Sequence, residues 1–124
     1  MTNVVLSSLP HTWLIDIDGT ILKHNGHKTG GDELLAGVKE FWASIPEGDV
    51  IILLSARTFE EMPATLKFLD AQLLRYNHAI FCMPKGERIL INDEKPGGLH
   101  TAKAINIRRD VGLNGWSVCI DETL

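Results

Sequence analysis

The sequence predicts an α/β fold, namely a three-layer, Rossmann-like, mainly parallel sheet with helices on both faces, formed by a single domain over residues 1–124. Apolar runs of strand length alternate along the chain with apolar stripes of helical period. Strands that alternate with helices favour a parallel sheet, because each helix returns the chain to the edge where the next strand begins. No repeat, linker or low-complexity stretch divides the chain into modules.

The first half of the chain supplies the clearest elements. Thr12 to Ile17 is a nearly continuous apolar run, which suits a central strand covered on both faces. Asp32 to Ile45 is predicted as an amphipathic helix that begins at Asp32 after two glycines. Its apolar stripe comprises Leu34, Leu35, Val38, Phe41, Trp42 and Ile45.

A second buried strand and a second helix follow. Val50 to Leu54 is entirely apolar, and a helical stripe is formed by Met62, Leu66, Leu69 and Leu73. Thr58 and Glu61 have the spacing of a capping box, yet Pro63 would then lie in the second turn. The start of this helix is therefore left open between Thr58 and Pro63.

The second half is predicted to add short strands at Ala79 to Cys82, Arg88 to Ile91 and Trp116 to Ile120. Thr101 to Arg108 fits both a strand and a helix face, and its partial alternation favours a strand.

Composition restricts the classes of function. The chain has 124 residues, 44% of them hydrophobic, and a net charge of −4, which argues against a nucleic-acid-coating or polybasic membrane-binding surface. Cys82 and Cys119 lie in apolar stretches without metal-ligand spacing, so buried free thiols are expected. With no leader sequence or membrane-length apolar segment, a cytoplasmic location is expected. The tryptophans lie in apolar segments and are interpreted as core residues: Trp13, Trp42 and Trp116.

Polar residues follow several of the predicted strands. Asp16 and Asp18 end the first strand with i, i+2 spacing, which places both carboxylates on one side of an extended chain. Individually such residues are ordinary turn, cap or surface residues. Their order is more specific than any one of them, because the carboxyl ends of parallel strands share one edge of the sheet. The later members are Ser55 and Arg57 after the second strand, Lys85 before the strand at 88–91, and Asn92 with Asp93 after it.

This order resembles the haloacid dehalogenase-like (HAD) superfamily of phosphatases and phosphotransferases, over residues 13–98. The most specific motif is Asp-x-Asp-Gly-Thr at residues 16–20. The resemblance implies that Asp16 is the nucleophile and Asp18 the general acid and base, and that Ser55 and Lys85 hold the phosphate. It also implies Mg²⁺ as cofactor, with ligands drawn from Asp16, Asp18, Asn92 and Asp93. Thr20 is expected to orient the loop at the substrate, and Arg57 to bind the substrate.

The chemistry accounts for these residue types. A phosphate dianion repels a carboxylate, so a hard cation bound to oxygen ligands must neutralise the site before Asp16 attacks. An aspartyl phosphate then divides a slow hydrolysis into two easier steps, with Asp18 moving the proton. Two assignments stay open: Asn92 or Asp93 as the metal ligand, and Lys85, Arg88 or Lys95 as the phosphate-binding cation.

The loops between the motifs are too short for an inserted cap domain, so the resemblance is to the small capless members and an open site is expected. Only a flap over Ile21 to Gly31 remains to cover it, with His24 and His27 as solvated residues. An open site suits a bulky substrate, or a small one enclosed by a second copy of the chain. Capless relatives act on sugar phosphates, nucleotides, nucleic-acid ends or phosphoproteins, and the acidic chain favours a phosphorylated metabolite such as a sugar phosphate.

Two other classes of protein remain open. One is a catalytically inactive phosphate-binding or scaffold relative. The other is a receiver-type phospho-acceptor domain, which is disfavoured because no strand between Ile17 and Ser55 offers a later accepting acid.

Overall fold

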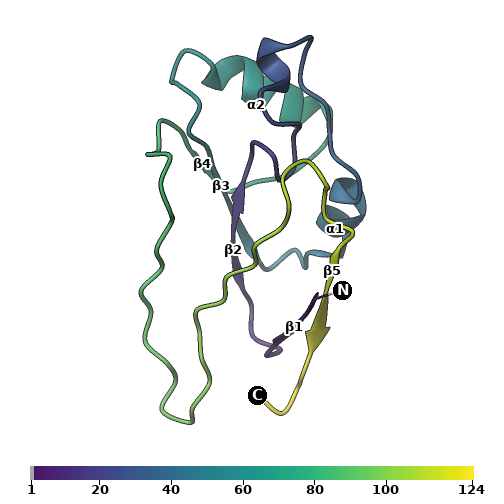
Figure 1. Cartoon of the computed structure of the whole chain (residues 1–124). Coiled ribbons are helices and arrows are strands. Elements are labelled where there is room, and N and C mark those ends of the chain that lie inside the picture. The colour runs from purple at the N-terminus through teal and green to yellow at the C-terminus, as the bar shows by residue number, and fades with distance from the viewer. Residues whose placement is uncertain (1) are drawn as a thin grey trace.

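The computed structural model describes residues 2–124 and confirms an α/β fold with parallel strands in two sheets and two α-helices (Figure 1). The elements in chain order are β1 (Thr2–Leu6), β2 (Thr12–Asp16), the 3-10 turn η1 (Gly26–Lys28), α1 (Val38–Ser44), β3 (Val50–Leu54), α2 (Met62–Ala71), β4 (His78–Ile80) and β5 (Trp116–Ile120). No helix within residues 2–124 combines the length and apolar character that crossing a bilayer requires.

Two consecutive strand–helix–strand units build the main sheet. Its strands lie in the order β2-β3-β4 and are parallel, with Asp16 opposite Leu54 and Leu54 opposite Ile80. α1 connects β2 with β3, and α2 connects β3 with β4. The carboxyl ends of all three strands therefore meet at one edge, as the sequence predicts.

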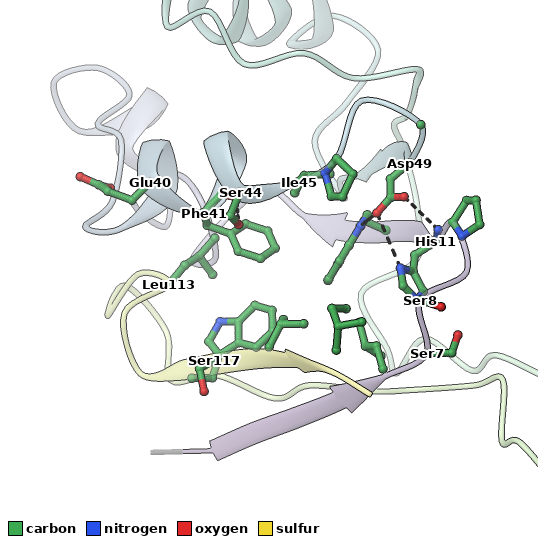
Figure 2. A pocket seen from close by; sticks show the side chains of 18 of the residues that line it. Ser7, Ser8, His11, Glu40, Phe41, Ser44, Ile45, Asp49, Leu113 and Ser117 are labelled. Atoms are coloured by element: carbon green, nitrogen blue, oxygen red, sulfur yellow. Dashed lines mark hydrogen bonds and ion pairs between the residues drawn. The ribbon is translucent and has the colours of Figure 1, made fainter. Parts of the chain in front are cut away.

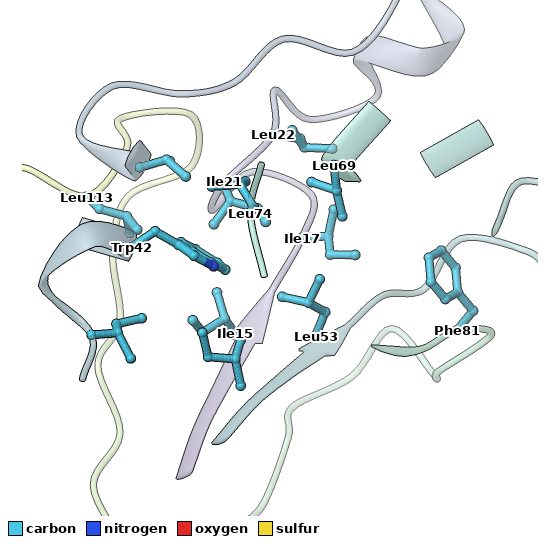
Figure 3. Close-up of a cluster of buried hydrophobic side chains, with 13 residues drawn as sticks. Ile15, Ile17, Ile21, Leu22, Trp42, Leu53, Leu69, Leu74, Phe81 and Leu113 are labelled. Atoms are coloured by element: carbon cyan, nitrogen blue, oxygen red, sulfur yellow. The ribbon is translucent and has the colours of Figure 1, made fainter. Parts of the chain in front are cut away.

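The hydrophobic core lies on one face of this sheet (Figure 3). Ile15 of β2 and Leu53 of β3 are partners in register, and both are buried. α1 adds Val38 and Trp42 to the same cluster, and α2 adds Leu69. Trp42 is thus a core residue as predicted, while Trp13 and Trp116 are half-buried around Phe41.

The prediction that β2 is a central strand covered on both faces is wrong. β2 forms an edge of its sheet, and Leu14, which points to the face opposite Ile15, is 48% exposed. β3 is the central strand of the three and is largely buried, in agreement with its apolar sequence.

The first helix is shorter than its apolar stripe. α1 begins only at Val38, because Gly37 has a φ of 78°, which is outside the helical region, and because residues before it make contacts that a helix would not allow. Leu34 forms an antiparallel bridge with Leu22, and Asp32 contributes its side chain to an ion-pair network described below.

The second helix begins at Met62, with Pro63 in its first turn, where a missing N–H costs little. Thr58 and Glu61 exchange the hydrogen bonds of a capping box just before it. The helix ends at Ala71, because Leu73 has a φ of 60°. β4 likewise stops at Ile80 rather than Cys82, whose φ is also 60°.

The strands predicted at Arg88 to Ile91 and Thr101 to Arg108 are wrong. Residues 84–108 form a long extended excursion without strand pairing (Figure 1). The excursion reverses at Lys95 to Leu99, where the Lys95 N–H donates to the Leu99 carbonyl. Ile89 and Ile91 are 83% and 90% exposed, so the apolar pattern of this segment has no core to face.

The ends of the described chain form the second sheet, in which β1 pairs in parallel with β5 from Thr2 opposite Trp116 to Leu6 opposite Ile120. β5 agrees with its prediction, whereas β1 is not predicted. Cys82 and Cys119 are free thiols as expected, but both are exposed rather than buried. Cys119 is exposed because the two-stranded sheet leaves much of β5 uncovered.

Candidate active site

The candidate site lies where β2 and β3 end. Asp16 is the last residue of β2, and Ser55 directly follows its register partner Leu54. Backbone hydrogen bonds extend the sheet one step further, from Ile17 N–H to the Leu54 carbonyl and from Ser55 N–H to the Ile80 carbonyl. The sheet edge therefore fixes Asp16 and Ser55 on neighbouring strands.

A tight turn at residues 17–22 sets the position of Asp18. The carbonyl of Ile17 accepts hydrogen bonds from the N–H groups of Thr20, Ile21 and Leu22, and Gly19 N–H donates to the Leu22 carbonyl at 2.7 Å. Ile21 and Leu22 are fully buried beneath this turn. The Asp-x-Asp-Gly-Thr motif is thus anchored in the core at its carboxyl end.

Asp16 has one neutral and one charged partner. Thr20 donates its hydroxyl to Oδ2 of Asp16 at 3.0 Å, and Arg88 donates Nη1 to Oδ1 at 2.6 Å. The Asp16 side chain is 35% exposed. A carboxylate that is both accessible and next to a cation is suited to meet an anionic substrate.

Asp18 is held by Arg57. Nε of Arg57 lies 3.1 and 3.0 Å from the two carboxylate oxygens of Asp18, and Nη2 lies 2.8 Å from Oδ1. Arg57 also forms two hydrogen bonds with Asp32 and one with Thr65. Burial alone would lower the pKa of Arg57, but hydrogen bonds with Asp32 and Asp18 raise it, so the guanidinium stays charged.

Ser55 lies at the site edge but is completely buried. Its hydroxyl oxygen accepts a hydrogen bond from the Arg57 N–H at 3.0 Å. In this arrangement Ser55 supports the turn that carries Arg57, and its hydroxyl has no surface open to solvent.

Lys85, Asn92 and Asp93 are all exposed on the 84–108 excursion. Nδ2 of Asn92 lies 2.6 Å from the Thr101 hydroxyl, which also contacts the Asp93 carbonyl, so this pair braces the tip of the excursion. Across residues 2–124, no three Asp, Glu, His or Cys side chains gather in a way that could hold a metal ion. The structure therefore brings Asp16, Asp18, Ser55, Thr20 and Arg57 together and leaves the Asp93 carboxylate outside that group.

The predicted flap is fastened at several points. Ile21 and Leu22 belong to the core, Lys23 N–H donates to the Glu33 carbonyl, and His24 N–H donates to Asp110 at 2.7 Å. His27 contacts Glu61 at the start of α2. The expectation of a solvated His27 is therefore wrong, because its side chain is only 18% exposed.

Sequence reasoning missed three residues that shape the site. Asp32 was interpreted only as a helix start, although its side chain binds Arg57. The Arg109 side chain packs against Gly19, and a Cβ added at Gly19 would lie 3.1 Å from Cγ of Arg109. The N–H of Asp110 donates a hydrogen bond to the Gly19 carbonyl. No local pattern marks these residues, since their roles depend on contacts with distant parts of the chain.

A cavity of about 710 Å³ lies elsewhere, between the two sheets (Figure 2). Its lining residues include the apolar side chains of Phe41, Ile45, Leu113 and Trp116, together with His11 and Asp49. Asp16, Asp18 and Ser55 are not among its lining residues. The cavity is mostly apolar, so the candidate site for chemistry remains the group formed by Asp16 and Asp18 at the end of β2 and by Ser55 and Arg57 after β3.

Comparison of the chain with protein-family models, curated proteins and solved structures finds no match. The geometry of this site and the sequence motif that forms it are therefore the features that indicate a function.

Proposed function

We propose that the chain is a phosphohydrolase that cleaves a phosphate monoester with Asp16 as the nucleophile. The observation that carries this proposal is the position of the Asp16 carboxylate at the end of β2, accessible to solvent and held between the Thr20 hydroxyl and the Arg88 guanidinium. A charged donor beside the nucleophile can bind the phosphate oxygens and align phosphorus for attack.

The reaction has two balanced steps. An oxygen of Asp16 bonds to phosphorus, the ester P–O bond breaks, and Asp18 supplies the proton that the leaving alkoxide takes up. Water then attacks the aspartyl phosphate, Asp18 accepts its proton, and the bond between phosphorus and Asp16 breaks to release inorganic phosphate. Arg88 is the phosphate-binding cation in this proposal, in preference to Lys85 and Lys95, because among the described residues it is the only one of these three cations that contacts Asp16.

Mg²⁺ is the proposed cofactor. Carboxylate and carbonyl oxygens suit this ion, and the Asp16 carboxylate and the backbone carbonyl of Asp18 would supply them, while among residues 2–124 no group of three acidic, His or Cys side chains adds Asp93 to them. Bound Mg²⁺ would offset the repulsion between a phosphate dianion and Asp16. Titration calorimetry with MgCl₂ tests the assignment: Asp16→Asn should weaken binding, Asp18→Asn should change it little because the backbone carbonyl remains, and Asp93→Asn shows whether a second carboxylate contributes.

The proposed substrate is a small phosphorylated metabolite such as a sugar phosphate. The net charge of −4 supports a small substrate over a nucleic acid, and the absence of an inserted domain supports an open site. A panel of sugar phosphates, nucleotides and phosphopeptides at equal concentration would identify the class.

We also propose that the sheet belongs to a three-layer arrangement in which residues 84–108 cover the face opposite the helices. The exposed side chains of Leu14 on that face and of Ile91 on the excursion support this idea. Leu14→Cys and Ile91→Cys, combined with Cys82→Ser and Cys119→Ser to remove the native thiols, should form a disulfide if the layer closes. A pair that remains reduced under mild oxidation would argue against it.

The central test is Mg²⁺-dependent release of phosphate from p-nitrophenyl phosphate. Wild type should turn over, Asp16→Asn should not, and Asp70→Asn should match wild type because Asp70 lies on the exposed side of α2. Equal rates for wild type and Asp16→Asn would reject Asp16 as the nucleophile.

The alternative is a catalytically inactive phosphate-binding or scaffold protein. It is favoured by the lack, among residues 2–124, of a three-residue metal-binding group that would include Asp93. Phosphate binding without turnover of any substrate in the panel would support this alternative.

A further inference from the structure

We propose that Asp32 and Arg57 are positioning residues that hold the Asp18 carboxylate in its reactive orientation, an inference that rests on the proposed function. Arg57 would then act through Asp18 and would not touch the substrate. Asp32, which has no assigned role, would act through Arg57.

Arg57 has no donor left for a substrate. A guanidinium carries five N–H groups, one on Nε and two on each Nη atom. The Nε donor and one Nη2 donor bind Asp18. The second Nη2 donor and one Nη1 donor bind Asp32. The second Nη1 donor binds the Thr65 hydroxyl at 2.8 Å. The Arg57 side chain is 2% exposed, so binding a phosphate there would require breaking existing bonds.

Asp32 completes the fixation of the guanidinium. Its two oxygens lie 3.0 and 2.8 Å from Nη1 and Nη2, on the side of the fork away from Asp18's contact with Nε. Its side chain is 8% exposed. Paired forks of this kind fix the plane of the guanidinium as well as its distance, so Asp18 meets a donor pair that cannot rotate.

Thr65 joins this network to α2. Its hydroxyl accepts from Arg57 and donates to the Glu61 carbonyl at 2.8 Å, and the residue is almost completely buried. The network thus connects the loop after β2, the segment before α1, the end of β3 and the first turn of α2. Rigid elements on several sides are what a catalytic acid needs, since a displacement of about 1 Å can cost ~100-fold in rate.

The two roles for Arg57 predict different kinetics. A substrate-binding arginine contributes to every substrate alike, whereas a residue that positions the proton donor matters most when the leaving group needs the proton. p-Nitrophenolate leaves readily without protonation, and the alkoxide of glycerol 3-phosphate does not. The ratio of kcat/KM for the alkyl and aryl substrates therefore reports the positioning of Asp18 during the first chemical step.

The experiment measures this ratio for wild type, Arg57→Lys and Asp32→Asn. We expect kcat/KM on glycerol 3-phosphate to fall about 10- to 100-fold in both variants, with a loss of roughly 3-fold or less on p-nitrophenyl phosphate. Arg75→Lys and Asp70→Asn are matched controls outside the site. Like Arg57, Arg75 donates several hydrogen bonds, but its two acceptors are backbone carbonyl groups. The controls should leave the ratio unchanged.

The outcomes separate this inference from the proposed function. Equal losses on both substrates in Arg57→Lys would overturn positioning and make Arg57 a phosphate-binding residue. An Asp32→Asn variant with the wild-type ratio would overturn the role of Asp32. A wild type that releases no phosphate, or an Asp16→Asn variant as active as wild type, would overturn the proposed function itself. Unfolding midpoints of all variants serve as a control. A smaller folded fraction would lower kcat/KM equally for the two substrates, so an equal loss is interpreted only in a variant whose midpoint matches that of wild type.

Discussion

Nη1 of Arg88 lies 2.6 Å from Oδ1 of Asp16, although the two residues are 72 positions apart in the chain. The contact joins the exposed 84–108 excursion to the sheet edge at the residue proposed as the nucleophile. It also distinguishes Arg88 from Lys85, which precedes it by three residues and has no such contact among those described.

Replacing Arg88 should weaken substrate binding more than replacing Lys85. Arg88→Ala removes a charge-assisted donor worth about 1.5–3 kcal/mol, so kcat/KM should fall roughly 10- to 100-fold. Lys85→Ala should stay within about 3-fold of wild type, because a solvated surface charge contributes little. Steady-state kinetics of the two variants decide the assignment, and a larger loss in Lys85→Ala would reverse it.

A methyl group at Gly112 should destabilise the fold. Gly112 has a φ of 89°, and a Cβ there would collide with the backbone of Ala36 just before α1. Gly112→Ala should cost about 1–3 kcal/mol or more in the free energy of unfolding. Gly115→Ala is the matched control, because a Cβ at Gly115 meets nothing within 4 Å. Urea unfolding of both variants measures the difference, and equal stabilities would contradict the close approach.

Glu61 should make stability depend on acid pH. The backbone N–H of Thr58, with its hydroxyl and His27, lowers the pKa of Glu61 from 4.5 to about 2, against the opposing effect of burial. Because the folded-state pKa is below the unfolded one, the ionised carboxylate stabilises the fold above the unfolded pKa, and this contribution disappears as pH falls toward the folded value.

Urea unfolding of wild type and Glu61→Gln across this pH range provides the test. Wild type should be the more stable at neutral pH, and its advantage should vanish between pH 4.5 and about 2. Glu60→Gln, which changes the exposed neighbouring residue, should show no comparable trend. An advantage that stays constant with pH would remove Glu61 as its source.

Two leucines of the α2 stripe should differ sharply in their contribution to stability. Leu69 is fully buried in the core, so Leu69→Ala should cost about 2–5 kcal/mol. Leu73 is 89% exposed, so Leu73→Ala should change stability by about 0.5 kcal/mol or less. Denaturant unfolding of each variant measures the costs, and similar values would show that the stripe continues to Leu73.

These leucines also show what hydrophobic periodicity can predict. The spacing of Met62, Leu66, Leu69 and Leu73 correctly indicates a helix, because its buried face repeats with the helical period. Periodicity does not indicate the left-handed backbone conformation at Leu73, which turns the chain out of the helix before the apolar stripe ends. The sequence predicts β3 with its correct bounds, because a short apolar run rich in Val and Ile favours a buried strand.

The excursion at 84–108 shows the opposite case. Arg88 to Ile91 has the composition of a strand, but a strand also needs a neighbouring edge with which to pair, and that depends on distant residues. For the site, the i, i+2 acids and the serine at the next strand end follow from local sequence and parallel pairing. The network of five donors around Arg57 does not follow from local sequence, because Asp32 is 25 positions away in the chain and is brought to Arg57 only by the tertiary structure.

The pairing of β1 with β5 constrains how the protein is made. β1 is translated before the other described strands, yet β5, which pairs with it, is translated only after the whole of the intervening chain. During synthesis Val4, Val5 and Leu6 have no partner strand until β5 is translated. The local β2-α1-β3 unit can already fold at that stage. The unpaired β1 segment is therefore where a chaperone would be most useful during synthesis.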